Sequence, residues 1–166
     1  MRMKVLGLFA ALLLVAACET TPEETAGTTG EGAAGAGAGT GVMEGPVPGS
    51  VEDFVLNVGD RVFFGFDKYD LTPEAQATLE RQAAWMQQHP SVTVTVEGHA
   101  DERGTREYNL ALGERRANSV KNYLVALGVS ANRIQTISYG KERPENPGQD
   151  EIAFSQNRRG VSVLSQ

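Results

Sequence analysis

The chain has 166 residues, with 15 Lys and Arg against 21 Asp and Glu, so its formal net charge at pH 7 is −6. This length accommodates one ordinary domain with extensions, and two full domains would be tight. The acidic balance argues against a protein that follows nucleic-acid phosphates, because such binding requires a basic face. The chain has one cysteine, which excludes an intramolecular disulfide and the paired cysteines of zinc or redox sites.

The first seventeen residues have the pattern of a bacterial export signal. Arg2 and Lys4 make a positive start, and residues 5–17 form an apolar run of thirteen residues. That run is shorter than the roughly 20 residues of a membrane-spanning helix, but it fits a signal peptide. Small residues directly before Cys18 resemble a lipoprotein processing box, so we predict a signal peptide at 1–17 and lipidation of Cys18. An ordinary cleaved signal beside an incidental thiol is the alternative.

A segment of low complexity follows the predicted lipidation site. Glu19 stands where an acidic residue resembles an inner-membrane retention signal of enterobacterial lipoproteins. Residues 19–50 are mainly Gly, Ala, Thr, Glu and Pro, without Lys or Arg. Such a segment cannot bury enough apolar surface to offset the cost of ordering, so 18–50 is predicted to be a disordered tether that begins at the lipidated cysteine. The composition changes at Val51, and 51–166 is long enough for a single core.

Within 51–166 the spacing of apolar residues alternates between the period of a strand and that of a helix. Apolar residues at every second position predict strands at 62–66, 92–97, 134–139 and 161–164. Thr72 followed by Pro73 is a typical helix start, and Pro90 ends that helix. Thr105 caps a longer helix that extends to Leu127. The helical positions expected in the core are Ala75, Leu79, Ala83 and Met86.

The resulting order is strand–helix–strand–helix–strand–strand, with a Pro- and Gly-rich loop or short helix before the last strand. This order predicts an α/β fold, a two-layer sandwich with the helices on one face of a small mixed sheet. Right-handed crossovers favour parallel neighbours, but the order of the strands does not follow from the pattern.

Three groups of residues lie at the ends of these elements, where binding sites tend to collect. They are residues 66–70, residues 98–104, and the helical stripe of Asn109, Leu112 and Arg116. If Asp101 and Arg116 face one hollow, they complement a zwitterion, because the carboxylate accepts from an ammonium and the guanidinium clamps a carboxylate. The end of an amino acid is such a ligand. Internal ion pairs are equally consistent with this spacing.

Four segments of the domain carry long, ordered motifs: EGHADERGT at 97–105, YNLALGERRA at 108–117, SYGKE at 138–142 and NRR at 157–159. Together they resemble the OmpA-like domain family, and most closely its branch of peptidoglycan-associated lipoproteins. The resemblance covers essentially 51–166, and the predicted lipoprotein signal agrees with it independently.

The resemblance implies a domain that binds the meso-diaminopimelate residue of the peptidoglycan stem peptide without covalent chemistry. By motif position, Asp101 resembles the residue that binds the ammonium and Arg116 the residue that binds the carboxylate. The remaining pocket residues that we predict are Phe66, Asp67, His99, Asn109 and Leu112.

The resemblance also implies an outer-membrane protein, anchored by its lipid, with the domain facing the periplasm. The implied partners are a TolB-like periplasmic protein and other components of the Tol–Pal system, which acts in envelope integrity and cell division. Neither a cofactor, a metal nor a nucleic acid is expected.

Two other functions remain open. One is a periplasmic protein-interaction module, with a TolB-type partner and little wall binding. The other is a cell-wall hydrolase built on His99 and Asp101. The sequence favours the hydrolase least, because His-x-Asp supplies two ligands whereas a catalytic zinc takes three from the protein.

Overall fold

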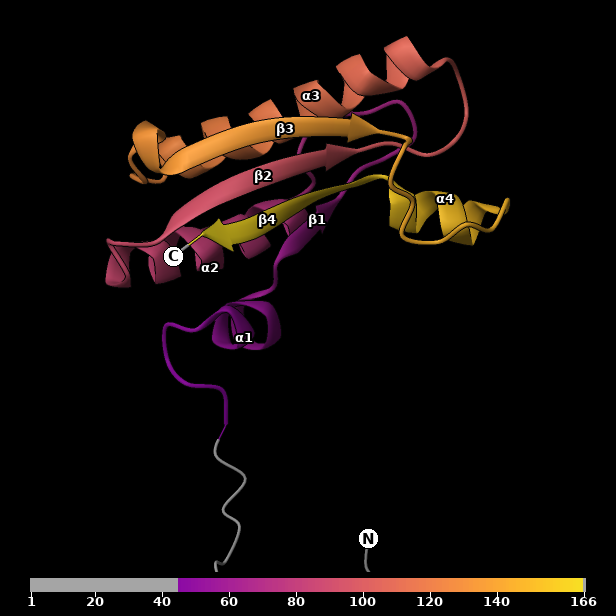
Figure 1. The fold of residues 1–166 in the computed structure, drawn as a ribbon. Coiled ribbons are helices and arrows are strands. Elements are labelled where there is room, and N and C mark those ends of the chain that lie inside the picture. Colours follow the sequence, from indigo (N-terminus) through magenta and orange to yellow (C-terminus); the bar gives the residue numbers. More distant parts are fainter. Residues whose placement is uncertain (1–44, 166) are drawn as a thin grey trace, which may run out of the picture. The chain divides into compact units, whose positions relative to one another are not determined.

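Residues 45–165 are described by a computed structural model. The predicted signal peptide at 1–17, the predicted lipidation at Cys18 and most of the predicted tether lie outside these residues. Four strands form one sheet in the order β1-β4-β2-β3 (Figure 1). The strands are β1 (Arg61–Phe63), β2 (Thr93–His99), β3 (Ile134–Gly140) and β4 (Arg159–Ser165). β2 and β3 are parallel, and β4 runs antiparallel to both of its neighbours, so the predicted mixed sheet is confirmed.

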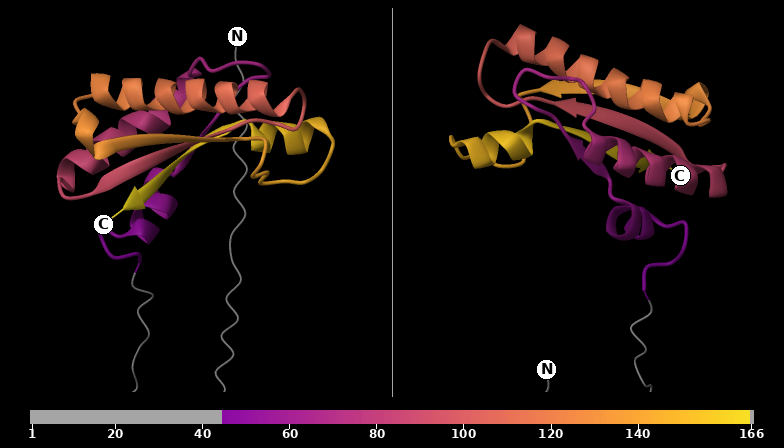
Figure 2. Two further views of the ribbon diagram at one scale, coloured as in Figure 1. Left: turned by 45° about the horizontal axis from the view of Figure 1, so that its top comes forward. Right: turned by 180° about the vertical axis from the view of Figure 1, so that it is seen from behind.

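Two long helices cover one face of this sheet (Figure 2). They are α2 (Pro73–Gln88), which packs on β1, and α3 (Arg106–Ala126), which packs on β2 and β3. Both helices begin where the sequence predicted. The hydroxyl groups of Thr72 and Thr105 cap them, each by accepting a hydrogen bond of 3.2 Å, from the backbone N–H groups of Ala75 and Tyr108 respectively. Gly128 lies just past α3 with a φ of 97°, a conformation that favours glycine.

The core lies between the helices and the sheet. Val94 and Val96 of β2 point toward the helices, whereas the intervening Thr95 is only partly buried, as the alternation predicted. The helices contribute fully buried apolar side chains to the same core: Leu79, Met86, Val120 and Leu124.

The contact between β2 and α3 depends on two glycines. A Cβ atom on Gly98 would lie 1.8 Å from the carbonyl oxygen of Gly113, which is far inside contact distance. Glycine at both positions therefore allows α3 to approach the sheet backbone directly. This approach brings the start of α3 close to the carboxyl end of β2.

The first strand is shorter than predicted. β1 ends at Phe63, and the backbone N–H of Phe64 pairs with Arg158 just before β4. The chain then turns at Asp67, which has a φ of 56°. Because of this turn, Phe66 leaves the sheet and is 59% exposed instead of continuing the alternation.

Four short helical segments lie among residues 45–165, and only the last of them falls where the sequence allowed for a short helix. They are α1 (Val51–Asp53), the π-helical turn η1 (Phe54–Val58), the 3-10 turn η2 (Ala131–Arg133) and α4 (Glu151–Asn157). The loop or short helix expected before the last strand is α4, and the carboxylate of Asp150 caps it by accepting 2.7 Å from the N–H of Ala153. A helix of two turns has too few residues for a clear 3.6-residue period.

Residues 45–58 form a segment that we call the N-terminal strap. Its Phe54 is buried and packs edge-on against Trp85 of α2, with ring centroids 5.0 Å apart. The indole N–H of Trp85 donates 2.8 Å to Asp53, and hydrogen bonds from Trp85, Asn57 and Gly49 lower the pKa of Asp53 to about 2. The strap is thus fastened to α2 at the amino end of β1.

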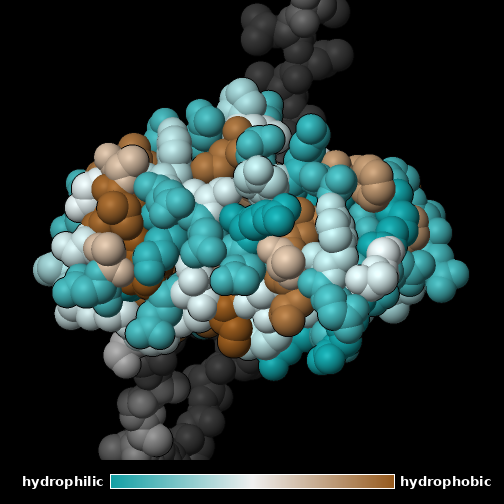
Figure 3. All heavy atoms as spheres, turned by 90° about the horizontal axis from the view of Figure 1, so that it is seen from above, coloured by the Kyte–Doolittle hydropathy of each residue, from teal (hydrophilic) through white to brown (hydrophobic). Residues whose placement is uncertain are grey.

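The face of the domain drawn in Figure 3 is mainly polar. Figure 3 shows that on the face seen from above, apolar side chains lie in several separate groups among polar ones. Within residues 45–165, the structure contains no helix with the length and apolar character needed to cross a membrane.

The close approach of β2 and α3 gives the first prediction. Gly98→Ala places a methyl group against the backbone of Gly113, where it cannot be relieved by a side-chain rotation. We expect a loss of about 3 kcal/mol or more in the free energy of unfolding, measured by urea denaturation. Gly45→Ala is the control, because a Cβ atom there has no neighbour within 4 Å. Equal stability of the two variants would show that this contact does not limit the packing of α3.

Candidate ligand-binding site

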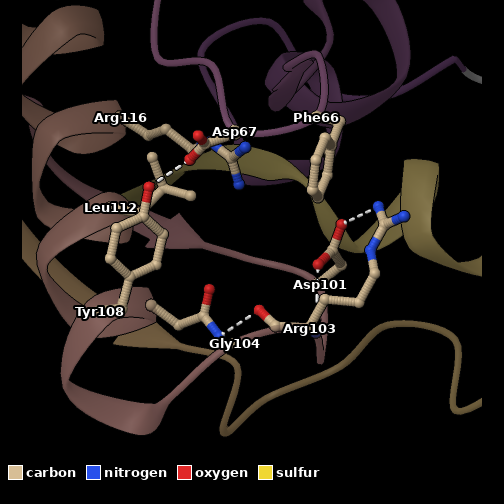
Figure 4. A pocket seen from close by; sticks show the side chains of 9 residues that line it. Phe66, Asp67, Asp101, Arg103, Gly104, Tyr108, Leu112 and Arg116 are labelled. Atoms are coloured by element: carbon tan, nitrogen blue, oxygen red, sulfur yellow. Dashed lines mark hydrogen bonds and ion pairs between the residues drawn. The ribbon is translucent and has the colours of Figure 1, made fainter.

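A cavity of about 220 Å³ lies at the carboxyl ends of β1 and β2, beside the first turns of α3 (Figure 4). The residues around it come from three segments: the loop after β1, the turn after β2, and one face of α3. The lining residues are Phe66, Asp67, Asp101, Arg103, Gly104, Tyr108, Asn109, Leu112 and Arg116. Asp101 and Arg116, the pair predicted to face one hollow, therefore line the same cavity.

Arg116 has no exposed surface, and its guanidinium is held by backbone carbonyl groups. Its Nε donates 2.8 Å to Lys68, Nη1 donates 2.7 Å to His99, and Nη2 donates 3.1 Å to Gly65. Arginine has five N–H groups, so these bonds leave one N–H on each terminal nitrogen. Burial lowers the pKa of Arg116 to about 10, with the charge of Asp101 acting in the opposite direction, so the guanidinium remains charged at neutral pH.

Asp101 is also buried, at 5% exposure, and it accepts several hydrogen bonds. Its Oδ2 accepts 2.6 Å from Nη2 of Arg103 and 3.4 Å from Nη1 of Arg158, and its Oδ1 accepts 3.2 Å from the backbone N–H of Arg103. Burial alone would raise the pKa of Asp101, but the hydrogen bonds and charge of Arg103 and the hydrogen bond from Arg158 outweigh it and lower that pKa. Asp101 is therefore an anion at neutral pH.

Four charged residues form a closed ring that includes Asp101, and we call it the ion-pair ring. From Asp101 it passes to Arg103 at 2.6 Å, to Glu151 of α4 at 3.4 Å, to Arg158 at 2.8 Å, and back to Asp101 at 3.4 Å. The guanidinium of Arg103 lies between two aromatic rings, 4.2 Å from the centroid of Phe66 and 4.5 Å from that of Phe154. The ring connects the turn after β2 with α4 and with the start of β4.

The opposite wall of the cavity contains a second carboxylate. Asp67 has a left-handed backbone conformation, which is uncommon for a residue other than glycine and more frequent for Asp and Asn. Its carboxylate accepts a hydrogen bond from the hydroxyl of Tyr108 on α3, and this bond raises the pKa of Tyr108. The bond connects the loop after β1 with the first turn of α3 across the cavity.

The turn after β2 is held from both sides. The side-chain amide of Asn109 donates 2.9 Å to the carbonyl of Arg103. The ammonium of Lys141, after β3, donates 3.1 Å to the carbonyl of Glu102 and 2.7 Å to that of Gly104. The SYGKE motif at 138–142 thus contributes a support for the turn that carries Asp101 and Arg103.

Six of the seven predicted pocket residues line the cavity; the exception is His99. The imidazole of His99 is 1% exposed and lies near Glu97, with Nε2 3.5 Å from the carboxylate, whereas its backbone carbonyl holds Arg116. Arg103 and Gly104 belong to the predicted group at 98–104 but were not named as pocket residues, and Tyr108 was missed as a lining residue. Tyr108 was detectable, because Tyr108, Leu112 and Arg116 follow each other at spacings of four on one helix face.

This arrangement matches a ligand that carries both charges. The cavity lining contains two carboxylates and two guanidinium groups, with apolar contributions from Phe66 and Leu112. Arg116 retains two N–H groups, a number that suits the two oxygens of a carboxylate. The hydrolase hypothesis requires the side chains of His99 and Asp101 in one site, and only Asp101 lines the cavity. Among residues 45–165, no three His, Cys, Asp or Glu side chains are grouped as metal ligands.

A two-layer α/β domain with a charged hollow at the ends of its strands is a candidate ligand-binding domain. Residues 63–158 match the family model described as OmpA family. The chain belongs to the OmpA family, and the family assignment made from the sequence motifs is confirmed.

Named proteins of this family are similar over most of the chain. The peptidoglycan-associated lipoprotein of Rhizobium meliloti is 56% identical over 132 residues, covering 80% of this chain and 73% of the relative. The peptidoglycan-associated lipoprotein of Mesorhizobium japonicum is 50% identical over 157 residues, covering 93% of this chain and 88% of the relative.

Solved structures agree with the fold. The peptidoglycan-associated lipoprotein from Burkholderia pseudomallei has a TM-score of 0.63 and 42% identity, covering 64% of this chain and 90% of that chain. The C-terminal domain of Helicobacter pylori MotB has a TM-score of 0.61 and 25% identity, covering 64% of this chain and 84% of that chain.

The buried imidazole of His99 gives a prediction about acid stability. Burial, followed by the charges of Arg159 and Arg143, lowers the pKa of His99 from 6.5 to about 4. The unfolded chain therefore binds a proton at higher pH than the folded chain does. The contribution of the neutral His99 imidazole to the free energy of unfolding is then fully present above pH 6.5. About 3 kcal/mol of it is lost as the pH falls toward 4.

Titration of the His99 imidazole by NMR measures this pKa directly, and urea denaturation at pH 7 and pH 4.5 measures its effect. His99→Leu should reduce the loss of stability between these two pH values. An imidazole that titrates near pH 6.5 in the folded protein would contradict the prediction.

Proposed function

We propose that this domain binds peptidoglycan non-covalently, by holding the side-chain end of meso-diaminopimelate in the cavity. That end carries an ammonium and a carboxylate on one carbon atom, so it is a small zwitterion. The observation that carries the proposal is the position of Asp101 and Arg116, which are oppositely charged, buried, and line the same cavity. The printed names of the relatives, peptidoglycan-associated lipoproteins, support it.

Each group of the ligand has a partner in this proposal. Asp101 accepts from the ammonium, and Arg116 donates its two remaining N–H groups to the carboxylate. Phe66 and Leu112 contact the methylene groups of the side chain, and Asn109 holds the turn that carries Asp101. Because both ions are buried and already oriented by hydrogen bonds, little ordering of the site accompanies binding.

The cellular role that we propose follows from this binding. A lipid on Cys18 anchors the chain in the outer membrane, and the domain in the periplasm holds the cell wall. Several acyl chains give stable attachment, at about 0.8 kcal/mol per buried CH₂ group. We further propose a TolB-like partner and a place in the Tol–Pal system, in envelope integrity and cell division. The role is reversible capture and requires no catalytic step.

Substitution of the two ions tests the ligand site. Asp101→Asn keeps the size of the side chain but removes the charge that receives the ammonium, so we expect affinity to fall roughly ten- to hundredfold, or about 1.5–3 kcal/mol. Arg116→Lys keeps the charge but cannot donate two parallel hydrogen bonds, so it should also weaken binding. Calorimetry with a stem peptide that contains diaminopimelate measures both effects.

Matched controls are available next to each residue. Glu102→Gln removes the adjacent carboxylate, and Arg115→Lys changes the adjacent arginine; neither residue lines the cavity. Since Arg116 supports three backbone carbonyls, urea denaturation must accompany its variant. If folded Asp101→Asn and Arg116→Lys proteins bind the peptide as the parent does, the proposed site is wrong.

A further inference from the structure

The guanidinium of Arg103 pairs with Asp101, the carboxylate that is proposed to receive the ligand ammonium. Its Nη2 lies 2.6 Å from Oδ2 of Asp101, the shortest contact of that carboxylate with a side chain. The guanidinium lies between Phe66 and Phe154 and has a second carboxylate partner, Glu151. Arg103 is therefore held by packing and charge, and it lines the cavity.

The consequence is a balance of charge in the cavity. Its lining contains the carboxylates of Asp67 and Asp101 and the guanidinium groups of Arg103 and Arg116, so the formal charge of the lining is zero. Arg158 and Glu151, the other members of the ion-pair ring, add one charge of each sign. Asp101 and Arg116 are nearly inaccessible to water, and unbalanced charge is costly in such surroundings.

Two ligands that differ by one carboxylate give the occupied cavity different total charges. Diaminopimelate brings an ammonium and a carboxylate, so the total charge stays at zero. Lysine has the same side chain without that carboxylate, so it adds one positive charge beside guanidinium groups. The repulsion from Arg103 acts on both ammonium groups, but in diaminopimelate the attraction of Arg103 for the carboxylate offsets much of it.

We infer that Arg103 is a specificity determinant, which makes the cavity select a zwitterionic side-chain end over a simple cationic one. The inference rests on the proposed function and identifies a residue beyond the Asp101 and Arg116 pair. In this role the positive charge of Arg103 offsets the negative charge of Asp101, so a ligand with an ammonium and no carboxylate gains little binding free energy in the cavity. Its guanidinium packs against the rings of Phe66 and Phe154.

The test compares two stem peptides that are identical except for diaminopimelate or lysine at one position. Calorimetry gives the affinity of each for the purified full-length protein. In Arg103→Gln, we expect binding of the lysine peptide to strengthen about tenfold, while that of the diaminopimelate peptide changes less than about threefold. The preference for diaminopimelate then falls, which a purely structural role of Arg103 would not produce.

Two further variants separate charge from packing. Arg103→Lys keeps the positive charge and should retain the preference of the parent protein. Arg106→Gln removes one positive charge three residues away, from a side chain that pairs with Glu142 outside the cavity, and should leave the preference unchanged.

The outcomes distinguish the two proposals. If the parent protein does not bind the diaminopimelate peptide, the proposed function fails, and this inference fails with it. If the parent binds but Arg103→Gln has the same preference, the role of Arg103 is wrong while the proposed function stands. A lysine peptide that remains undetectable at millimolar concentration with both proteins counts as the same preference, and so does an equal loss of affinity for both peptides.

Discussion

The buried guanidinium of Arg116 holds together the parts of the molecule that form the cavity. From the middle of α3 it donates to the carbonyls of Gly65 and Lys68, after β1, and to that of His99, at the end of β2. A buried charge without partners would be strongly destabilising, so these segments must close around Arg116 as the domain folds. The same side chain therefore contributes to the folded structure and lines the cavity.

The remaining features of the site complement this arrangement. Gly98 and Gly113 let α3 approach β2, which places Arg116 within reach of the carbonyl of His99. The ion-pair ring holds Asp101 from the side of α4, and Tyr108 holds Asp67 from α3. Each charged side chain of the cavity is thus oriented by partners within the protein. Such preorganisation reduces the entropy lost on binding.

Local patterns in the sequence were sufficient for much of this structure. Thr72–Pro73, Thr105 and the alternating valines of β2 predicted the elements that the structure contains, because caps and strand periodicity depend on neighbouring residues. The insertion of β4 between β1 and β2 was not predictable, since strand pairing joins distant segments. For the same reason the ion-pair ring was missed: its partners Arg103 and Glu151 are 48 residues apart. The stripe of Asn109, Leu112 and Arg116 was found because helical spacing is local.

The N-terminal strap and the cavity lie at opposite ends of β1. If the proposed ligand is held at Asp101 and Arg116, a pull on the strap acts at the opposite end of β1 from the ligand, and it is carried both by β1 and by the contacts of the strap with α2. The part carried by β1 would load its pairs Arg61–Val161, Val62–Gly160 and Phe63–Arg159 with β4 in shear, so that they share the force. β1 continues into the loop whose carbonyls accept hydrogen bonds from Arg116, so under the proposed function the load and the ligand would act on the same buried side chain.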